Sequence, residues 1–128
     1  MSETPPEDGL FAVWTPTQAE FDLFARLSGD DNPIHVDPDF SARTRFGRTV
    51  SHGMLIHAKV WALIAAAYPG RRHARQDLMF PAPSYADEPL AIAITPRQGE
   101  PDTLDIVVRR LADGVATLTG TCHLGDAS

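Results

Sequence analysis

Residues 52–68 read HGMLIHAKVWALIAAAY, and Pro69-Gly70 follows directly. In a helix built from this run, apolar side chains occupy more than one face, which is typical of a helix buried in a core rather than lying on a surface. The Pro-Gly pair predicts its end, because proline does not continue a helix and glycine readily adopts the left-handed cap. The sequence therefore predicts one long buried helix with Gly53 in its first turn.

After this helix the chain changes to a strand pattern. Strands are expected at residues 78–80, 90–95, 103–111 and 115–124, and apolar and polar residues alternate in the third of them. Asp113-Gly114 separates the last two strands, and this dipeptide favours a tight hairpin. Helices followed by strands indicate an α+β fold with antiparallel pairing.

The segment before the helix is also patterned. Residues 1–9 are expected to be a disordered tail, so the folded domain covers residues 10–128 and begins with a short strand at 10–14. A helix is expected next, with Thr15 as N-cap, Pro16 in its first position and Gln18 completing a capping box. Further on, Asp37-Pro38 predicts the start of a short helix.

Composition limits the function classes. The chain has 128 residues, 43% of them apolar, and a formal charge of −6, so one soluble cytoplasmic domain without a nucleic-acid surface is expected. The longest apolar run, residues 62–68, is too short to cross a membrane. Cys122 is the only cysteine and is expected to pack in a strand. The basic residues within 71–75 fit a solvated turn slightly better than a phosphate site.

The loop Asp30-Asp31-Asn32-Pro33-Ile34-His35 carries the first chemical signal. Pro33 keeps Asn32 out of the helical region, so the loop is expected to be partly extended and Asp30 and His35 can converge on one water molecule. Asn32 is expected to bond its own loop backbone. By itself this pattern is also that of an ordinary turn with a capping Asp and a surface His, and Asp31 is an alternative base.

His52-Gly53-Met54 carries the second signal. A helix start offers free N–H groups, and a ligand oxygen can approach a glycine closely, so the Gly53 amide is a candidate oxyanion donor. His52 fits a buried or capping histidine better than a catalytic one, and His57 one turn on could line the site. The five-residue spacing of these histidines does not suit a helical metal site, and no metal is predicted.

Residues 30–54, DDNPIHVDPDFSARTRFGRTVSHGM, closely resemble the hydratase 2 motif of the MaoC-like (R)-specific enoyl-CoA hydratases, D-x-N-P-x-H-x-D followed by F-G and H-G-M. Phe80 to Asp87 loosely resembles a strand of that family reading F-x-x-P-V-x-x-G-D. The resemblance implies a hot-dog fold, in which an antiparallel β-sheet wraps around the long helix, and a homodimer.

The resemblance also implies a lyase of fatty acid metabolism that hydrates trans-2-enoyl-CoA, or an enoyl thioester of acyl carrier protein, reversibly to the (R)-3-hydroxyacyl thioester. Asp30 and His35 would be catalytic, with Asp30 favoured as base and His35 as acid. Gly53 would supply the oxyanion amide. Coenzyme A would enter only as part of the substrate, with no separate cofactor. The remaining expected substrate-binding residues are Asn32, His52, Met54 and Trp61.

Two departures from the family pattern bear on substrate choice. Trp61 replaces a small polar residue eight positions after the glycine, which favours a short or unusual acyl chain. Asp87-Glu88 replaces the G-D turn. Two other functions remain open: a hot-dog thioesterase that attacks the carbonyl carbon, and a non-catalytic subunit that binds acyl thioesters.

Overall fold

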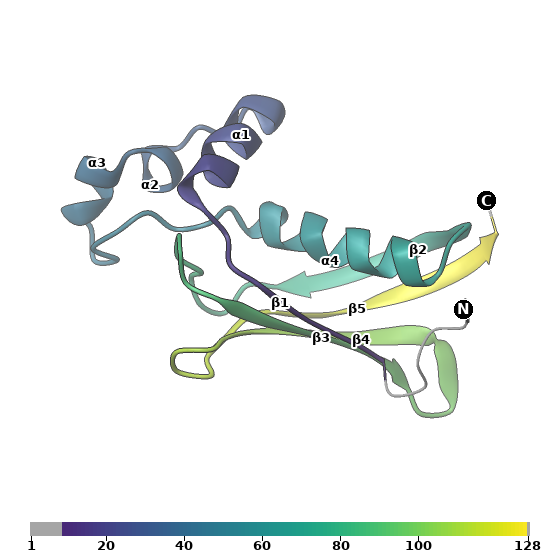
Figure 1. The fold of residues 1–128 in the computed structure, drawn as a ribbon. Helices are drawn as coiled ribbons and strands as arrows, with labels where there is room; N and C mark the ends of the chain where they lie inside the picture. The colour runs from purple at the N-terminus through teal and green to yellow at the C-terminus, as the bar shows by residue number, and fades with distance from the viewer. Residues whose placement is uncertain (1–8, 128) are drawn as a thin grey trace.

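The computed structural model describes residues 9–127 and places one long helix against a five-stranded sheet (Figure 1). The helix, α4, spans Gly53–Ala67 with His52 as N-cap and Tyr68 as C-cap, so the predicted long helix is confirmed. Its predicted burial is correct for one face only, because Met54 and Trp61 on the other side are about half exposed. The strands are β1 (Leu10–Trp14), β2 (Arg71–Met79), β3 (Leu90–Arg97), β4 (Glu100–Arg110) and β5 (Ala116–Ala127). They lie in the order β1-β3-β4-β5-β2, and every pairing is antiparallel, as predicted.

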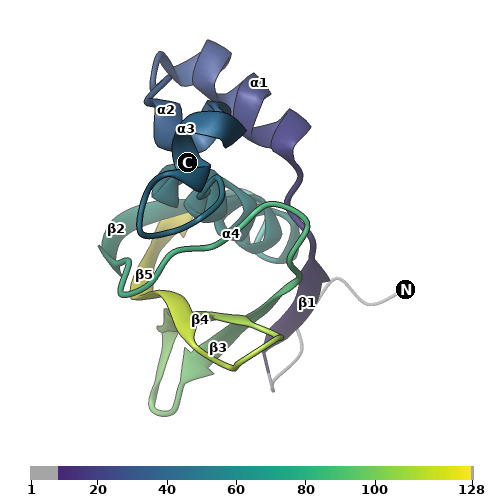
Figure 2. The same cartoon turned by 90° about the vertical axis from the view of Figure 1, so that its left-hand side faces the viewer.

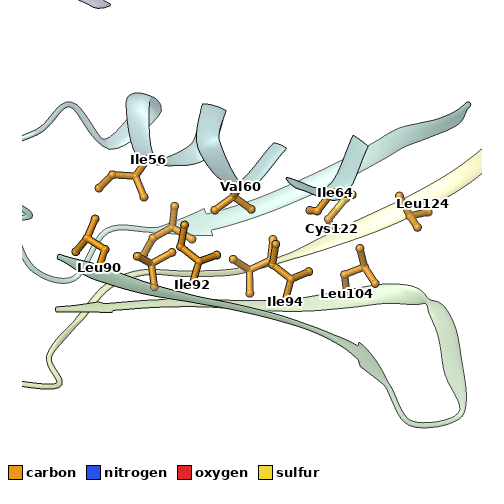
Figure 3. Packing of buried hydrophobic residues seen from close by; sticks show 12 residues of the cluster. Ile56, Val60, Ile64, Leu90, Ile92, Ile94, Leu104, Cys122 and Leu124 are labelled. Atoms are coloured by element: carbon orange, nitrogen blue, oxygen red, sulfur yellow. The ribbon is translucent and has the colours of Figure 1, made fainter. Parts of the chain in front are cut away.

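The core lies between α4 and the sheet, which curves around the helix in the end-on view of Figure 2. One face of α4 contributes Ile56, Val60 and Ile64 at helical spacing. Alternate residues of the three central strands meet them, as Figure 3 shows. These are Leu90, Ile92, Ile94, Leu104, Ile106, Val108, Leu118, Cys122 and Leu124. Burial of Cys122 raises the pKa of its thiol, so the thiol stays protonated and packs as an apolar group.

Three short helices, α1 (Gln18–Ser28), α2 (Pro33–Val36) and α3 (Pro38–Ala42), lie together near the amino-terminal end of α4 (Figure 1). The predicted start of α1 was wrong by two residues: Thr17 is the N-cap, and its capping box is closed by Glu20. The helix ends at Ser28, with Gly29 as C-cap in the left-handed conformation at φ 82°. Asp37 caps α3 as expected, its carboxylate accepting from the Phe40 N–H at 3.1 Å.

One predicted strand needs correction, and one predicted hairpin is confirmed. The run at 78–80 was too short, because β2 begins at Arg71 and the basic residues expected in a turn lie on this edge strand, paired with β5. The Asp113-Gly114 hairpin is confirmed: Gly114 has φ 73°, and the Arg110 N–H donates to the Val115 carbonyl at 2.9 Å.

The segment between β2 and β3 is held by backbone contacts to other parts of the chain, including a bridge between Val50 and Tyr85. Its Asp87 is the only non-glycine residue among 9–127 with a positive φ, 64°. In the family pattern quoted above this position is glycine, the residue that adopts a positive φ most readily. The Asp87 N–H donates to the Pro16 carbonyl at 2.7 Å and ties the segment to the start of α1.

Some expectations concern parts of the chain beyond these elements. The predicted tail, residues 1–9, lies outside the described residues except for Gly9. Within residues 9–127, no helix has both the length and the apolar character that crossing a bilayer takes.

Candidate active site

The side chains of Asp30, in the loop before α2, and His35, within α2, lie close together, and the pair is called the dyad below. The Asp30 Oδ2 and His35 Nε2 atoms are 3.8 Å apart, which is too long for a direct hydrogen bond but places both within hydrogen-bonding reach of one water. The predicted extended loop ends at Asn32, because the short helix α2 begins at Pro33. His35 therefore lies on a helical turn and not on an extended segment. The Asn32 side chain caps this turn, accepting from the Ile34 N–H at 3.2 Å, as predicted.

The proton arrangement of His35 follows from its other nitrogen. Its Nδ1 lies 2.8 Å from the Val50 carbonyl oxygen, and a carbonyl only accepts, so Nδ1 carries a hydrogen and donates. In the neutral ring, Nε2 therefore presents a lone pair toward Asp30. His35 can give a proton from Nε2 only as the doubly protonated imidazolium. The side chain is 11% exposed, whereas that of Asp30 is 56% exposed.

Gln18 holds the backbone of the site, a role that the sequence did not suggest. Its amide nitrogen donates to the His35 carbonyl at 2.8 Å, and its amide oxygen accepts from the Thr49 hydroxyl at 2.6 Å. The predicted capping box had assigned Gln18 to the start of α1. Because Thr17 and Glu20 form that box instead, the Gln18 side chain is free to connect α1 with the dyad.

His52 is 2% exposed and lies beneath the dyad. Its ring stacks on the His35 ring with centroids 3.9 Å apart and an interplanar angle of 25°. Its Nε2 is 2.8 Å from the Asp30 backbone oxygen, so Nε2 carries the hydrogen and donates. Burial lowers the pKa of His52, with the neighbouring His35 acting in the same direction, while the hydrogen bond to Asp30 opposes the shift. The prediction of a buried histidine is confirmed, but its side chain forms no cap hydrogen bond with α4.

Gly53 and His35 line one cavity of about 300 Å³. Gly53 is the first residue of α4, where helical N–H groups have no acceptor within the helix. The Phe80 ring covers its Cα so closely that a methyl group there would lie 2.9 Å from Cε1. The cavity walls are mostly apolar, with Ile34, Phe46, Val50, Ile56, Phe80, Pro81, Ala82 and Pro83 among the lining residues.

A larger hollow of about 640 Å³ lies along α1, between Asp22, Arg26 and Asp31. It includes neither His35 nor Gly53. Of these two hollows, only the smaller is lined by both His35 and the helix start at Gly53, and Asp30 is among the lining residues of neither.

Three other residues considered from the sequence do not line this cavity. Met54 is 52% exposed and is not in the cavity wall. Trp61 is 49% exposed, packs against His73 at 5.2 Å between ring centroids, and lines a separate hollow with Arg71 and Arg72. His57 is also outside the cavity, since its Nε2 meets the Gln76 side chain at 3.3 Å.

The arrangement does not suit a metal ion, although Asp30, His35 and His52 each bring one ligand-type atom within 4.8 Å of the others. An imidazole binds a metal through a lone pair in the plane of its ring. The two rings are stacked nearly parallel, so their in-plane lone pairs do not converge on one point. One nitrogen of each ring is also engaged with a backbone carbonyl.

The chain has an Asp–His pair beside the start of one long helix, and an antiparallel sheet wraps that helix. This architecture places it among proteins of the hot-dog fold, and comparison with known proteins identifies the family. The family described as MaoC like domain matches residues 4–109, and this chain belongs to it.

Two solved structures have a similar fold. An R-hydratase of Pseudomonas aeruginosa, solved without ligand, superposes with a TM-score of 0.81 at 28% identity, over 93% of this chain and 81% of that one. The (R)-hydratase of Aeromonas caviae, described as involved in PHA biosynthesis, gives 0.79 at 30% identity, over 93% and 96%. The predicted hot-dog fold is thereby confirmed.

Curated relatives carry related names. An (R)-specific enoyl-CoA hydratase of Aeromonas caviae is 39% identical over 72 residues, which are 55% of this chain and 54% of the relative. A 3-hydroxybutyryl-CoA dehydratase of Methylorubrum extorquens is 31% identical over 105 residues, 80% of this chain and 60% of the relative. The chain thus spans between about half and two thirds of the length of these two relatives.

Proposed function

We propose that this protein is a hydro-lyase that adds water reversibly to a trans-2-enoyl thioester of coenzyme A and forms the (R)-3-hydroxyacyl thioester. The observation that carries the proposal is the 3.8 Å separation of Asp30 Oδ2 and His35 Nε2, with His35 lining a cavity that also contains the helix start at Gly53. The names of the relatives, hydratases and dehydratases of acyl thioesters, support it.

The mechanism requires the dyad to carry one mobile proton. A water between the two groups gives a proton to one of them as its oxygen attacks C3, and the other group delivers a proton to C2. Because the His35 Nδ1–H is held by Val50, the working states are the Asp30 carboxylate with the His35 imidazolium, or protonated Asp30 with neutral His35. We favour the first, with Asp30 as base.

Charge grows on the thioester oxygen as C3 is attacked. The free N–H of Gly53 and the positive end of α4 stabilise that charge, and they are fixed before the reaction begins. A donor of this type typically contributes about 3 kcal/mol to transition-state stabilisation. In the reverse direction the same groups remove water from the 3-hydroxyacyl thioester.

The first test is the variant Asp30→Asn, with Asp31→Asn as its matched control. Both side chains are exposed, so both variants should fold. We expect Asp30→Asn to lower kcat for crotonyl-CoA hydration about a thousandfold, because one half of the acid–base pair is lost, and Asp31→Asn to stay near wild type. Loss of the conjugated-enoyl absorbance measures the rate, and chiral analysis identifies the product.

Three results would contradict the proposal. Unchanged turnover in Asp30→Asn would remove that carboxylate from the mechanism. Release of free thiol without hydration would instead indicate a thioesterase, and binding of acyl-CoA without either reaction would indicate a non-catalytic subunit.

Three further expectations remain predictions. The substrate can be carried by acyl carrier protein instead of coenzyme A, and parallel assays with the two thioesters decide between them. A homodimer and a cytoplasmic location are tested by light scattering of the purified protein and by cell fractionation.

A further inference from the structure

His52 contacts both members of the dyad through two different parts of its ring. Its edge meets the Asp30 backbone, with Nε2 2.8 Å from the carbonyl oxygen. Its face meets the His35 ring, with centroids 3.9 Å apart. Asp30 and His35 lie five residues apart on a loop, and His52 comes from the N-cap of α4. One side chain from outside the loop therefore fixes the distance between the two groups.

The surroundings of His52 keep its ring in place. Phe24 of α1 packs against it with centroids 4.8 Å apart, and Phe21 meets it edge-on at 6.5 Å. Phe21 itself is fully buried. Gly53, the first residue of α4, follows His52 directly in the chain. The residue that contacts the dyad is therefore bonded to the residue that starts the helix. The ring thus connects the proton-transfer groups with the candidate oxyanion donor.

The hydrogen bonds of His52 indicate why a histidine stands here. Its Nδ1 is buried and has no hydrogen-bond partner within residues 9–127. A buried polar atom left without a partner is unfavourable, so packing alone would be served better by phenylalanine. The favourable part of the ring is Nε2–H, which donates to the Asp30 carbonyl. The hydrogen bond from Nε2–H therefore explains why histidine occupies position 52. The unpaired Nδ1 is an unfavourable consequence of having an imidazole ring there.

The charge of His52 matters for His35. The proposed working state has an imidazolium at His35, and a neutral aromatic ring beneath it is favourable because a cation is attracted to a π face. A second positive charge at 3.9 Å would oppose that state. Burial keeps the His52 ring neutral by lowering its pKa.

We propose, on the basis of the function proposed above, that His52 is a positioning residue whose Nε2–H holds the Asp30 carbonyl while its ring face supports His35. The two contacts are separable by substitution. His52→Gln keeps an N–H donor at the distance of Nε2 but loses the aromatic face. His52→Phe keeps the face but loses the donor, and His52→Asn has a donor too short to reach the carbonyl.

The experiment measures kcat, KM and the pH profile of kcat/KM for crotonyl-CoA in these variants. We expect His52→Phe and His52→Asn to lower kcat about tenfold or more with KM within about twofold of wild type, because the dyad is misplaced while binding is kept. His52→Gln should recover most of kcat, but the limb of its pH profile that reports His35 should move. His57→Gln and His57→Phe, on the same helix outside the cavity, should match wild type.

A second measurement keeps the test independent of folding defects and of turnover. Imidazole ¹⁵N and ¹H chemical shifts of the wild-type protein report which nitrogen of each ring is protonated. We expect His52 as the neutral Nε2–H form, and a changed His35 titration in His52→Gln. Wild-type kcat in a folded His52→Phe, or His52 in the Nδ1–H form, overturns the inference. Absence of hydration in wild type overturns the proposed function, while the shifts still decide the placement of His52.

Discussion

The amino-terminal end of α4 and the rest of the helix lie in different environments. Along most of its length the helix presents Ile56, Val60 and Ile64 to apolar residues of three strands, and all of these side chains are buried. At its amino-terminal end it meets buried polar groups. Three side-chain atoms there, His52 Nδ1, Ser84 Oγ and Thr117 Oγ1, are buried without a hydrogen-bond partner within residues 9–127. A fourth such atom, His73 Nε2, lies beside Trp61 toward the other end of the helix. The apolar packing therefore supplies most of the stability, and three of these four unfavourable polar atoms gather at the amino-terminal end, beside the candidate site.

The largest effect on stability is expected from the apolar part. Ile64→Ala removes a fully buried side chain between α4 and the sheet and should lower the free energy of unfolding by about 3 kcal/mol. Urea denaturation measures the loss. Hydration by the folded fraction should stay near wild type, since Ile64 does not line the cavity. A large fall in kcat of the folded protein would show that core and site are not independent.

A smaller effect on stability is expected from a change at the amino-terminal end of α4. Gly53→Ala adds a methyl group 2.9 Å from the Phe80 ring, which is 43% exposed and can move aside. We expect unfolding free energy within about 1 kcal/mol of wild type, because the displaced group is a flexible side chain. Activity should fall about tenfold, because the ring and the donor beside it are shifted.

The double variant Gly53→Ala with Phe80→Ala sharpens this test. Removing the ring relieves the contact, so part of the lost kcat should return relative to Phe80→Ala alone. If the two losses simply add, the Phe80 ring is not the cause of the Gly53→Ala defect.

The smallest expected effect is a pH dependence shared by both ends. His52 lies at one end of α4, and His73 packs against Trp61 toward the other; burial lowers the pKa of both rings, and His57 also lowers that of His73. The unfolded chain binds protons first as pH falls below about 6.5, so the stability from these neutral rings is complete above that pH and is lost below it.

Urea denaturation at pH 8 and at pH 5.5 measures this loss. His52→Gln and His73→Gln should each reduce the difference between the two pH values, with the pH 8 data of each variant as its own baseline. A difference that both variants leave unchanged would assign the acid sensitivity to other groups.

Local signals in the sequence predicted the fold well. The helix in 52–68 and the Asp113-Gly114 turn were recognised because helix ends and hairpin geometry depend on nearby residues. Which faces of the helix are covered depends on the rest of the fold, so the exposure of Met54 and Trp61 was not predicted. The start of α1 was not, because Thr15-x-x-Gln18 and Thr17-x-x-Glu20 both satisfy the capping pattern. Long-range contacts decide between them: the Pro16 carbonyl is engaged by Asp87.

The first part of β2 was missed for a related reason. Residues 71–77 are polar and basic, and an edge strand needs few apolar residues because one partner strand supplies its ladder. At the site, the motif indicated Asp30, His35 and Gly53. The contacts of Gln18 and the orientation of His52 join residues 17 and 22 positions apart, and no local pattern encodes such contacts.

The Gln18 amide uses both of its ends, giving a hydrogen to the His35 carbonyl and taking one from Thr49. A carboxylate has the same shape but no hydrogen to give. Deamidation of this one side chain would therefore set two oxygens against each other beside His35, so chemical ageing at the start of α1 would disturb the dyad while every residue of the hydratase 2 motif stayed intact.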